Sequence, residues 1–296
     1  MKGVVMRGFR KRFKLAVFLL FFINTSVFCD SENDRDMLKA IEEENLIQIS
    51  KLISENPDII KDSYEKISRN QFVIKSVLGK KYKSMTELLR CGLNPNEKDD
   101  SCATPLFFLA TNCCYPENNA NKIKFLEYLL SNGANPNIEV IRKNKLPKTT
   151  PLMNVCGYLV YDFSENALTV AKLLIKYGAD INYKNELGQT PLSTALENGN
   201  IDIAYFLIIS CKCEIEGFHY DSFEDYNNDC NKVSNLQLLR RIVIDLRSPK
   251  YKKKKQIIKE FKKKGLDYKK EPIPKEALDL IKQFYPEKEE LYLKKY

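Results

Sequence analysis

Residues 185–200 read NELGQTPLSTALENGN, and this stretch decides the fold. Thr190 can cap a helix N-terminus by accepting a bond from a backbone N–H. Pro191 is tolerated at the first helical position, because the donor that it lacks has no partner there, and Leu192 then begins a buried face. Twelve residues before the threonine, Gly178 can adopt the left-handed conformation that ends a helix. The stretch therefore predicts the end of one helix, a loop and the start of the next helix.

The tripeptide Thr-Pro-Leu occurs three times, at residues 104–106, 150–152 and 190–192. An apolar run follows each copy and leads to a short turn. These turns begin at Gly133, Gly178 and Cys211, and an earlier, degenerate copy of the run and turn reads ELLRCGLNPN over residues 87–96. The spacing from Gly178 to Thr190 is 12 and from Thr190 to Cys211 is 21, which gives a period of 33 residues. A period of this length predicts a repeat architecture in which each unit is a helix, a turn, a second helix and a projecting loop.

These motifs and this period resemble the ankyrin repeat family, whose pattern is roughly D-x-x-G-x-T-P-L-H-x-A-A-x-x-G-H-x-x-x-V-x-x-L-L-x-x-G-A-D-x-N. The resemblance implies an all-α solenoid of helix-turn-helix-loop units stacked in one dimension. We expect about five repeats over residues 33–216. Residues 217–296 would add a sixth, degenerate repeat and a basic helical C-terminal extension.

The sequence departs from the family pattern in several places. The family's His after Thr-Pro-Leu is replaced by Phe107, Met153 and Ser193, which removes a hydrogen-bond network from each repeat. Two repeats carry about eight and seven extra residues between their helices, in segments 112–121 and 157–165, and the hairpin 138–149 is five residues longer than its neighbours. Cys102 and Cys211 stand where the repeat expects glycine.

Helices are also expected outside the Thr-Pro-Leu units. We predict them over residues 36–43, 46–54, 70–78, 84–90, 235–246, 256–264 and 275–284. The first two look like an N-terminal capping repeat. The segment 265–268, Gly-Leu-Asp-Tyr, echoes the Gly-Ala-Asp-x-Asn turn that closes a repeat.

Composition argues against most catalytic classes. The chain has 296 residues, 44% hydrophobic and 29% charged, so it can bury a core. His219 is its one histidine, which excludes multi-His metal sites and leaves His-dependent catalysis a single candidate. The 11 glycines form no phosphate-binding loop, and no nucleophile elbow is present. We therefore predict a protein that is not an enzyme and needs no cofactor or metal; an unrecognised enzyme is the alternative.

The nine cysteines do not have the C-x₂-C spacing of zinc sites. We expect Cys102, Cys156 and Cys211 to be small core or turn residues. In an exported protein, one or two disulfides among the eight cysteines that follow residue 29 are the alternative.

The amino terminus has the layout of a secretory signal peptide. Residues 1–29 carry six Lys and Arg residues and no acids, and an apolar run, LAVFLLFFI, occupies residues 15–23. Cleavage after Ser26 or Cys29 would release an exported protein, periplasmic or secreted. An uncleaved membrane anchor formed by residues 15–28 and a lipoprotein at Cys29 are the alternatives.

Charge is distributed unevenly along the chain. Residues 1–29 carry a net charge of +6 and residues 248–296 carry +8, which leaves −5 on the part between them. The segment Lys252–Lys264 is basic and amphipathic. We expect its apolar residues to pack on the preceding repeat with the lysines in solvent; the alternatives are that the segment binds an anionic membrane or cell-wall surface, or another partner such as an acidic protein. Export makes nucleic acid an unexpected ligand.

The resemblance implies a non-catalytic protein-protein interaction module, which we expect to be a monomer. Ankyrin proteins bind partners mostly through hairpin tips and inner helices on the concave face. Carried over to this sequence, the predicted partner-binding residues are Asp100, Ser101, Ala103, Leu146, Pro147, Thr149, Glu186, Leu187, Gln189, Glu197 and Asn198. A peripheral envelope scaffold held by the Lys-rich segment is the alternative function.

Overall fold

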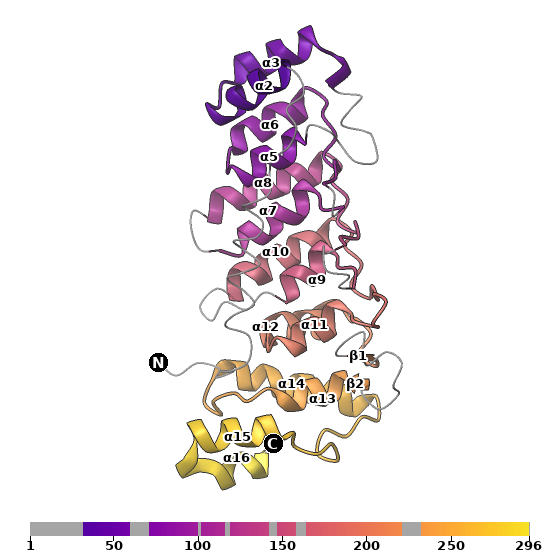
Figure 1. The fold of residues 1–296 in the computed structure, drawn as a ribbon. Coiled ribbons are helices and arrows are strands. Elements are labelled where there is room, and N and C mark those ends of the chain that lie inside the picture. Colours follow the sequence, from indigo (N-terminus) through magenta and orange to yellow (C-terminus); the bar gives the residue numbers. More distant parts are fainter. Residues whose placement is uncertain are drawn as a thin grey trace.

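The computed structural model describes residues 32–59, 71–99, 102–115, 119–141, 147–157, 164–220 and 232–295. Within these ranges, antiparallel helix pairs stack into one elongated column (Figure 1). The predicted all-α repeat solenoid is confirmed. A short two-stranded antiparallel sheet of β1 (Phe218–Tyr220) and β2 (Lys232–Ser234) is added to it, with Phe218 opposite Ser234.

The N-terminal pairs are α2 (Glu32–Glu42) with α3 (Leu46–Glu55) and α5 (Phe72–Leu78) with α6 (Tyr82–Arg90). The Thr-Pro-Leu pairs are α7 (Pro105–Cys113) with α8 (Asn119–Ser131), α9 (Pro151–Cys156) with α10 (Ser164–Lys176), and α11 (Pro191–Glu197) with α12 (Ile201–Tyr205) and the π-helix η1 (Phe206–Ser210). The C-terminal elements are α13 (Asn235–Arg241), α14 (Pro249–Lys263), α15 (Lys275–Phe284), the 3₁₀ turn η4 (Pro286–Lys288) and α16 (Glu289–Lys295).

Each Thr-Pro-Leu threonine caps its helix as predicted. Its side-chain oxygen accepts the backbone N–H three residues later, in the pairs Thr104–Phe107 at 3.4 Å, Thr150–Met153 at 3.3 Å and Thr190–Ser193 at 3.1 Å. In α11 the Ser193 hydroxyl also accepts the Thr190 N–H at 2.8 Å, which completes a capping box. Ser193 thus provides a local bond at the position of the family His, whereas Phe107 and Met153 are buried there.

The predicted left-handed turns are confirmed with one correction. Gly92, Gly133 and Gly178 have φ of +96°, +89° and +90°, and Cys102 takes the place of a glycine with φ of +58°. The prediction that Cys211 occupies the next such position is wrong, since its φ is −91°.

The left-handed residue in that fifth unit is Lys212, with φ of +58°. The reason is η1, which adds one residue to the turn. The N–H of Cys213 bonds to Leu207 O six residues back, whereas that of Ala179 bonds to Leu174 O five residues back.

The helices α13 and α14 lie where the sixth repeat is expected, and their bounds differ from the prediction. The expected helix 235–246 ends at Arg241, because Ile242 is extended and its side chain enters the core. The expected helix 256–264 is longer and begins at Pro249, after a Ser248 cap. This Ser-Pro pair uses the same physical signal as Thr-Pro and was available in the sequence.

One apolar core runs through the stack from Met37 to Tyr268. Its continuity shows that α13 and α14 pack on the preceding repeat and belong to the same column. A smaller cluster of Val243, Ala277, Ile281 and Tyr292 holds α15 and α16 against the end of the column.

Candidate binding surface

A ladder of asparagine side chains joins successive hairpins. Asn96 Nδ2 donates to Gly133 O at 2.8 Å, and its Oδ1 accepts the N–H of Asn135 at 2.7 Å. Asn137 repeats both bonds one unit later, with Gly178 O at 2.8 Å and the N–H of Asp180 at 2.7 Å. These side chains are the last residue of the Gly-Ala-Asp-x-Asn turn. They set the hairpins of adjacent repeats in register.

The ladder changes at the sixth repeat. Asn182 still accepts the N–H of Glu214 at 2.9 Å. The next equivalent position, however, holds Glu216 instead of asparagine. Asn235 at the start of α13 forms a different link, by donating to Ile215 O at 2.9 Å.

Charged side chains connect the ends of two neighbouring hairpins. Lys148 Nζ lies 2.9 Å from Glu139 and 3.6 Å from Glu186, and the Lys148 backbone N–H donates to Glu186 at 3.0 Å. The hydrogen bond from Lys148 lowers the pKa of Glu139, and the reciprocal bond raises the pKa of Lys148. The Tyr183 hydroxyl donates to Glu139 at 2.9 Å. The predicted contact residue Glu186 is exposed, but its carboxylate is already paired with Lys148.

The other predicted contact residues divide into three groups. Asp100, Ser101 and Leu146 lie outside the described residues. Ala103, Thr149 and Leu187 are buried, while Pro147, Gln189, Glu197 and Asn198 are partly exposed.

The burial of Ala103 and Thr149 has a local cause. Each directly precedes a capping threonine, where the chain turns from the hairpin into the helix. Leu187 packs inside its turn, and its N–H bonds to Asn185 Oδ1 at 3.0 Å. Among the predicted contact residues that the structure describes, those with exposed surface are Glu186, Pro147, Gln189, Glu197 and Asn198.

The inner helices present small polar side chains close together. Asn154 on α9 donates to the Thr111 hydroxyl on α7 at 2.7 Å. A Cβ at Gly157 would meet the Thr194 methyl group of α11 at 3.1 Å, so the Gly157 backbone lies directly against the Thr194 side chain. Partly exposed Thr111, Asn154, Thr194 and Asn198 thus form a shallow polar surface beside the hairpins.

Sequence reasoning missed two exposed apolar side chains on the hairpins. Ile141 is 46% exposed and Phe218, on β1, is 52% exposed. Lys232 on β2 lies 4.9 Å from the Phe218 ring centroid. Ile141 lies in the lengthened hairpin 138–149, and an apolar residue in such an insertion is the signal that could have identified it.

The lysines of α14 form a stripe on the outer side of the sixth repeat. Tyr251, Lys254, Ile257 and Phe261 are buried, which confirms the predicted packing of the apolar residues on the preceding repeat. The exposed stripe consists of Lys252, Lys255, Lys259 and Lys262. At 1.5 Å rise per residue, it spans about 15 Å of helix.

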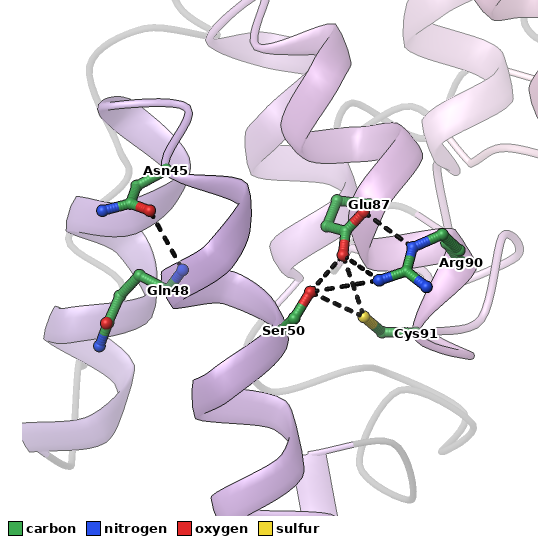
Figure 2. Close-up of polar contacts among 6 residues, drawn as sticks. All are labelled: Asn45, Gln48, Ser50, Glu87, Arg90 and Cys91. Carbon is green, nitrogen blue, oxygen red and sulfur yellow. Dashed lines mark hydrogen bonds and ion pairs between the residues drawn. The ribbon is translucent and has the colours of Figure 1, made fainter.

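A polar cluster between α3 and α6 contains a cysteine and a carboxylate (Figure 2). Arg90 binds Glu87 as a fork, with Nε–Oε2 at 2.9 Å and Nη2–Oε1 at 2.6 Å, and the Ser50 hydroxyl also donates to Glu87. The Arg90 bond holds the pKa of Glu87 at about 2, and burial raises the pKa of the Cys91 thiol. A carboxylate this acidic is a weak base and the thiol is little ionised, so the cluster is suited to joining two outer helices.

The cysteines among the described residues form no metal site and no disulfide. No group of three or more His, Cys, Asp or Glu side chains among them could hold a metal ion. Cys91, Cys102, Cys113, Cys114, Cys156, Cys211 and Cys213 are free thiols. Burial raises the pKa of Cys113 and of Cys213 to about 12, which makes both poor nucleophiles near neutral pH.

The predicted signal segment, residues 1–29, lies outside the described residues. Within the part that the structure does describe, no helix is both long enough and apolar enough to cross a membrane.

Stacked helix pairs with projecting hairpins define a helical-repeat solenoid, a class of protein that works through an extended surface. The family profile for ankyrin repeats, in three copies, matches residues 112–218. Residues 112–218 of the chain are therefore ankyrin repeats.

Relatives share parts of this region. The chain is 36% identical over 111 residues to an ankyrin repeat protein of Rickettsia felis, which is 36% of this chain and 46% of that protein. It is 31% identical over 126 residues to an ankyrin repeat protein of Fowlpox virus, 43% of this chain and 18% of that protein. It is 34% identical over 88 residues to protein phosphatase 1 regulatory subunit 27 of Homo sapiens, 30% of this chain and 57% of that protein. The chain thus spans between 18% and 57% of the length of these relatives.

Proposed function

We propose that the chain is a non-catalytic protein-binding module, exported to the cell envelope or beyond, whose contact surface is the hairpin edge and the adjoining inner helices. The observation that carries this proposal is the hairpin edge itself. The asparagine ladder and the Lys148 ion pairs hold successive hairpins in register, and Ile141 and Phe218 are exposed on them.

Physical chemistry supports a protein partner over a small molecule. Apolar and aromatic side chains that become buried on binding supply most of the energy of a protein interface, and a polar surround completes the contact. Glu197 and Asn198, at the C-terminal end of α11, can provide such a surround beside the hairpins. One relative is by its name a regulatory subunit of a phosphatase, which is a role exercised on another protein.

The test uses a photo-crosslinking amino acid in the full chain, expressed in its native cells. It is placed at Ile141 or Phe218, and the matched controls are Ile47 and Leu291, which are exposed apolar residues at the two ends of the column. We expect a discrete protein adduct from the hairpin positions only. Adducts that form equally at the control positions, or at none, would refute the proposed surface.

Export is inferred from residues 1–29 and has its own test. The intact mass of the native protein from fractionated cells should lack residues 1–26 or 1–29. A full-length mass in the membrane fraction would support the anchor formed by residues 15–28. A full-length mass in the soluble fraction would refute export.

The lysine stripe of α14 favours a second candidate function, a peripheral scaffold on an anionic membrane. Each lysine near such a surface contributes about 1 kcal/mol, and the attraction weakens with salt. A variant with Lys252, Lys255, Lys259 and Lys262 all changed to Gln should lose binding to phosphatidylglycerol vesicles at low salt.

The matched control for the stripe removes the same charge from scattered exposed positions. It changes Lys39, Lys124, Lys172 and Lys184 to Gln. If both variants bind vesicles equally, or if the unchanged chain does not bind at low salt, the membrane function is refuted.

A further inference from the structure

A charged residue occupies a core position in the sixth repeat. Six residues after the capping threonine, the three Thr-Pro-Leu repeats place Ala110, Cys156 and Leu196, all buried. In the sixth repeat the cap is Ser234 and the equivalent residue is Arg240, which is only 4% exposed. Arginine keeps its charge at any pH at which the protein is folded, so the chain buries a cation where its own repeats bury an apolar group.

Two of the three guanidinium nitrogens of Arg240 lack a hydrogen-bond acceptor. Its Nε and Nη1 atoms are buried, and neither has a hydrogen-bond partner. The group lies over the ring of Tyr268, 4.4 Å from the centroid, and the Tyr268 hydroxyl is likewise buried without a partner of hydrogen-bond geometry. Contact with the ring stabilises the charge but satisfies none of the N–H groups. Three polar atoms at one place therefore need a partner.

A second basic side chain lies beside Arg240. Lys254 is 1% exposed, and its Nζ lies 5.2 Å from the centroid of the same Tyr268 ring. It donates to Ile242 O at 2.6 Å, and Lys122 makes the equivalent bond to Asn112 O at 3.3 Å in the third repeat. The bond of Lys254 is thus explained by an equivalent lysine in another repeat. Arg240 has no equivalent, because the Thr-Pro-Leu repeats place apolar residues at its position.

We propose that the place formed by Arg240, Tyr268 and Lys254, named here the Arg240 site, binds a small oxoanion such as phosphate or a carboxylate. Such a group can accept hydrogen bonds from the buried guanidinium N–H groups of Arg240, and the Tyr268 hydroxyl can donate to another of its oxygens. A water molecule would satisfy single donors but would leave the buried charge uncompensated, which is costly in a low-dielectric interior. The lysine stripe on the exposed side of α14 would raise the local concentration of anions.

The test follows equilibrium unfolding of the full chain in urea while phosphate is varied at constant ionic strength, with chloride as the replacement anion. Because unfolding opens the site, phosphate reaches binding equilibrium even if it enters the folded protein slowly. One saturating site raises the free energy of unfolding by up to about 1.4 kcal/mol for each tenfold increase in phosphate. Acetate in place of phosphate distinguishes a general oxoanion site, stabilised by both anions, from one that requires phosphate.

Arg240→Gln should remove the dependence on phosphate concentration. Arg247→Gln, at an arginine whose side chain is 82% exposed, is the matched control and should keep it. Comparing slopes against concentration separates binding from any change in stability that the substitution itself causes. Should Arg240→Gln fail to fold, Tyr268→Phe keeps the ring, and its slope should fall several-fold.

The proposal is overturned if the free energy of unfolding depends on phosphate no more strongly in the unchanged chain than in Arg240→Gln. The dependence that both share is then the general effect of the salt on the protein surface. An unchanged slope in Tyr268→Phe, where Arg240→Gln does not fold, also overturns it. Neither result bears on protein binding at the hairpins, which involves other residues.

Discussion

Glu97 caps a helix that has no threonine of its own, and this makes the second repeat sensitive to pH. Gln71, at the N-cap of α5, makes no side-chain capping bond. The buried Glu97 carboxyl group instead accepts the N–H groups of Ile74 and Val73, the third and second residues of α5. Burial raises the pKa of Glu97 from 4.5 to about 8, although these bonds favour the charged form.

The sign of the pH effect follows from this shift. Between pH 4.5 and about 8 the folded chain keeps a proton on Glu97 that the unfolded chain has lost. The contribution of Glu97 to stability is thus full below pH 4.5 and is lost as the pH rises, with a slope that approaches 1.4 kcal/mol per pH unit. Glu97→Gln keeps an acceptor for the Ile74 N–H and cannot ionise. We therefore expect this variant to gain stability relative to the unchanged chain as the pH rises from 5 to 8.

The assay is urea denaturation at each pH, with the difference between the two proteins as the readout, so that the titration of all other groups cancels. Glu55→Gln, which removes a carboxylate from an exposed position of α3, is the matched control. Glu97→Ala should lose about 2 kcal/mol or more at pH 5, because it leaves two N–H groups without an acceptor. A pH-independent difference for Glu97→Gln would refute the reasoning.

Three further predictions concern single positions. Asn137→Ala removes two hydrogen bonds to the next repeat and should lower the free energy of unfolding, measured in urea, by about 1–2 kcal/mol. The control Asn132→Ala removes one bond within its own repeat and should lose less. Equal losses would contradict the stabilising role of the asparagine ladder. Cys102→Gly relieves a left-handed φ of +58° and should stabilise the chain by about 1 kcal/mol, seen as a higher Tm; a lower Tm would contradict it. Burial and the Arg240 charge hold the pKa of Lys254 far below 10.5, so the contribution of Lys254 to the free energy of unfolding should grow as the pH rises toward 10.5. Lys254→Met, measured in chloride buffer, should remove this rise between pH 7 and 10. The same dependence on pH in the variant and in the unchanged chain would contradict the prediction.

Much of the repeat could be predicted from local sequence, because the signals act within a few residues. Thr190 and Pro191 begin a helix through bonds that reach only three residues ahead, and Gly178 ends one through its own φ. The same logic would have located Ser248 and Pro249 at the start of α14. The ankyrin repeats and the all-α solenoid therefore follow from residues adjacent in the chain.

The candidate surface was harder to predict, since exposure depends on which neighbour covers a side chain. Ala103 and Leu187 belong to hairpins that the family uses for contacts, yet here they are buried. Glu186 is exposed as expected, but its pairing with Lys148 links two hairpins that are 38 residues apart in sequence. Pattern matching assigns a residue to a hairpin and says nothing of what lies against it.

The sequence by itself determined the repeat, its period and its capping residues, because these depend on backbone conformations that single residue types favour. Only the tertiary structure decided that Lys212 rather than Cys211 takes the left-handed turn, that Glu97 caps α5 and that Arg240 lies in the core. Each of these depends on contacts between segments that the chain brings together only when it folds. Burial and hydrogen bonding across such contacts outweigh the local preference of the residue concerned.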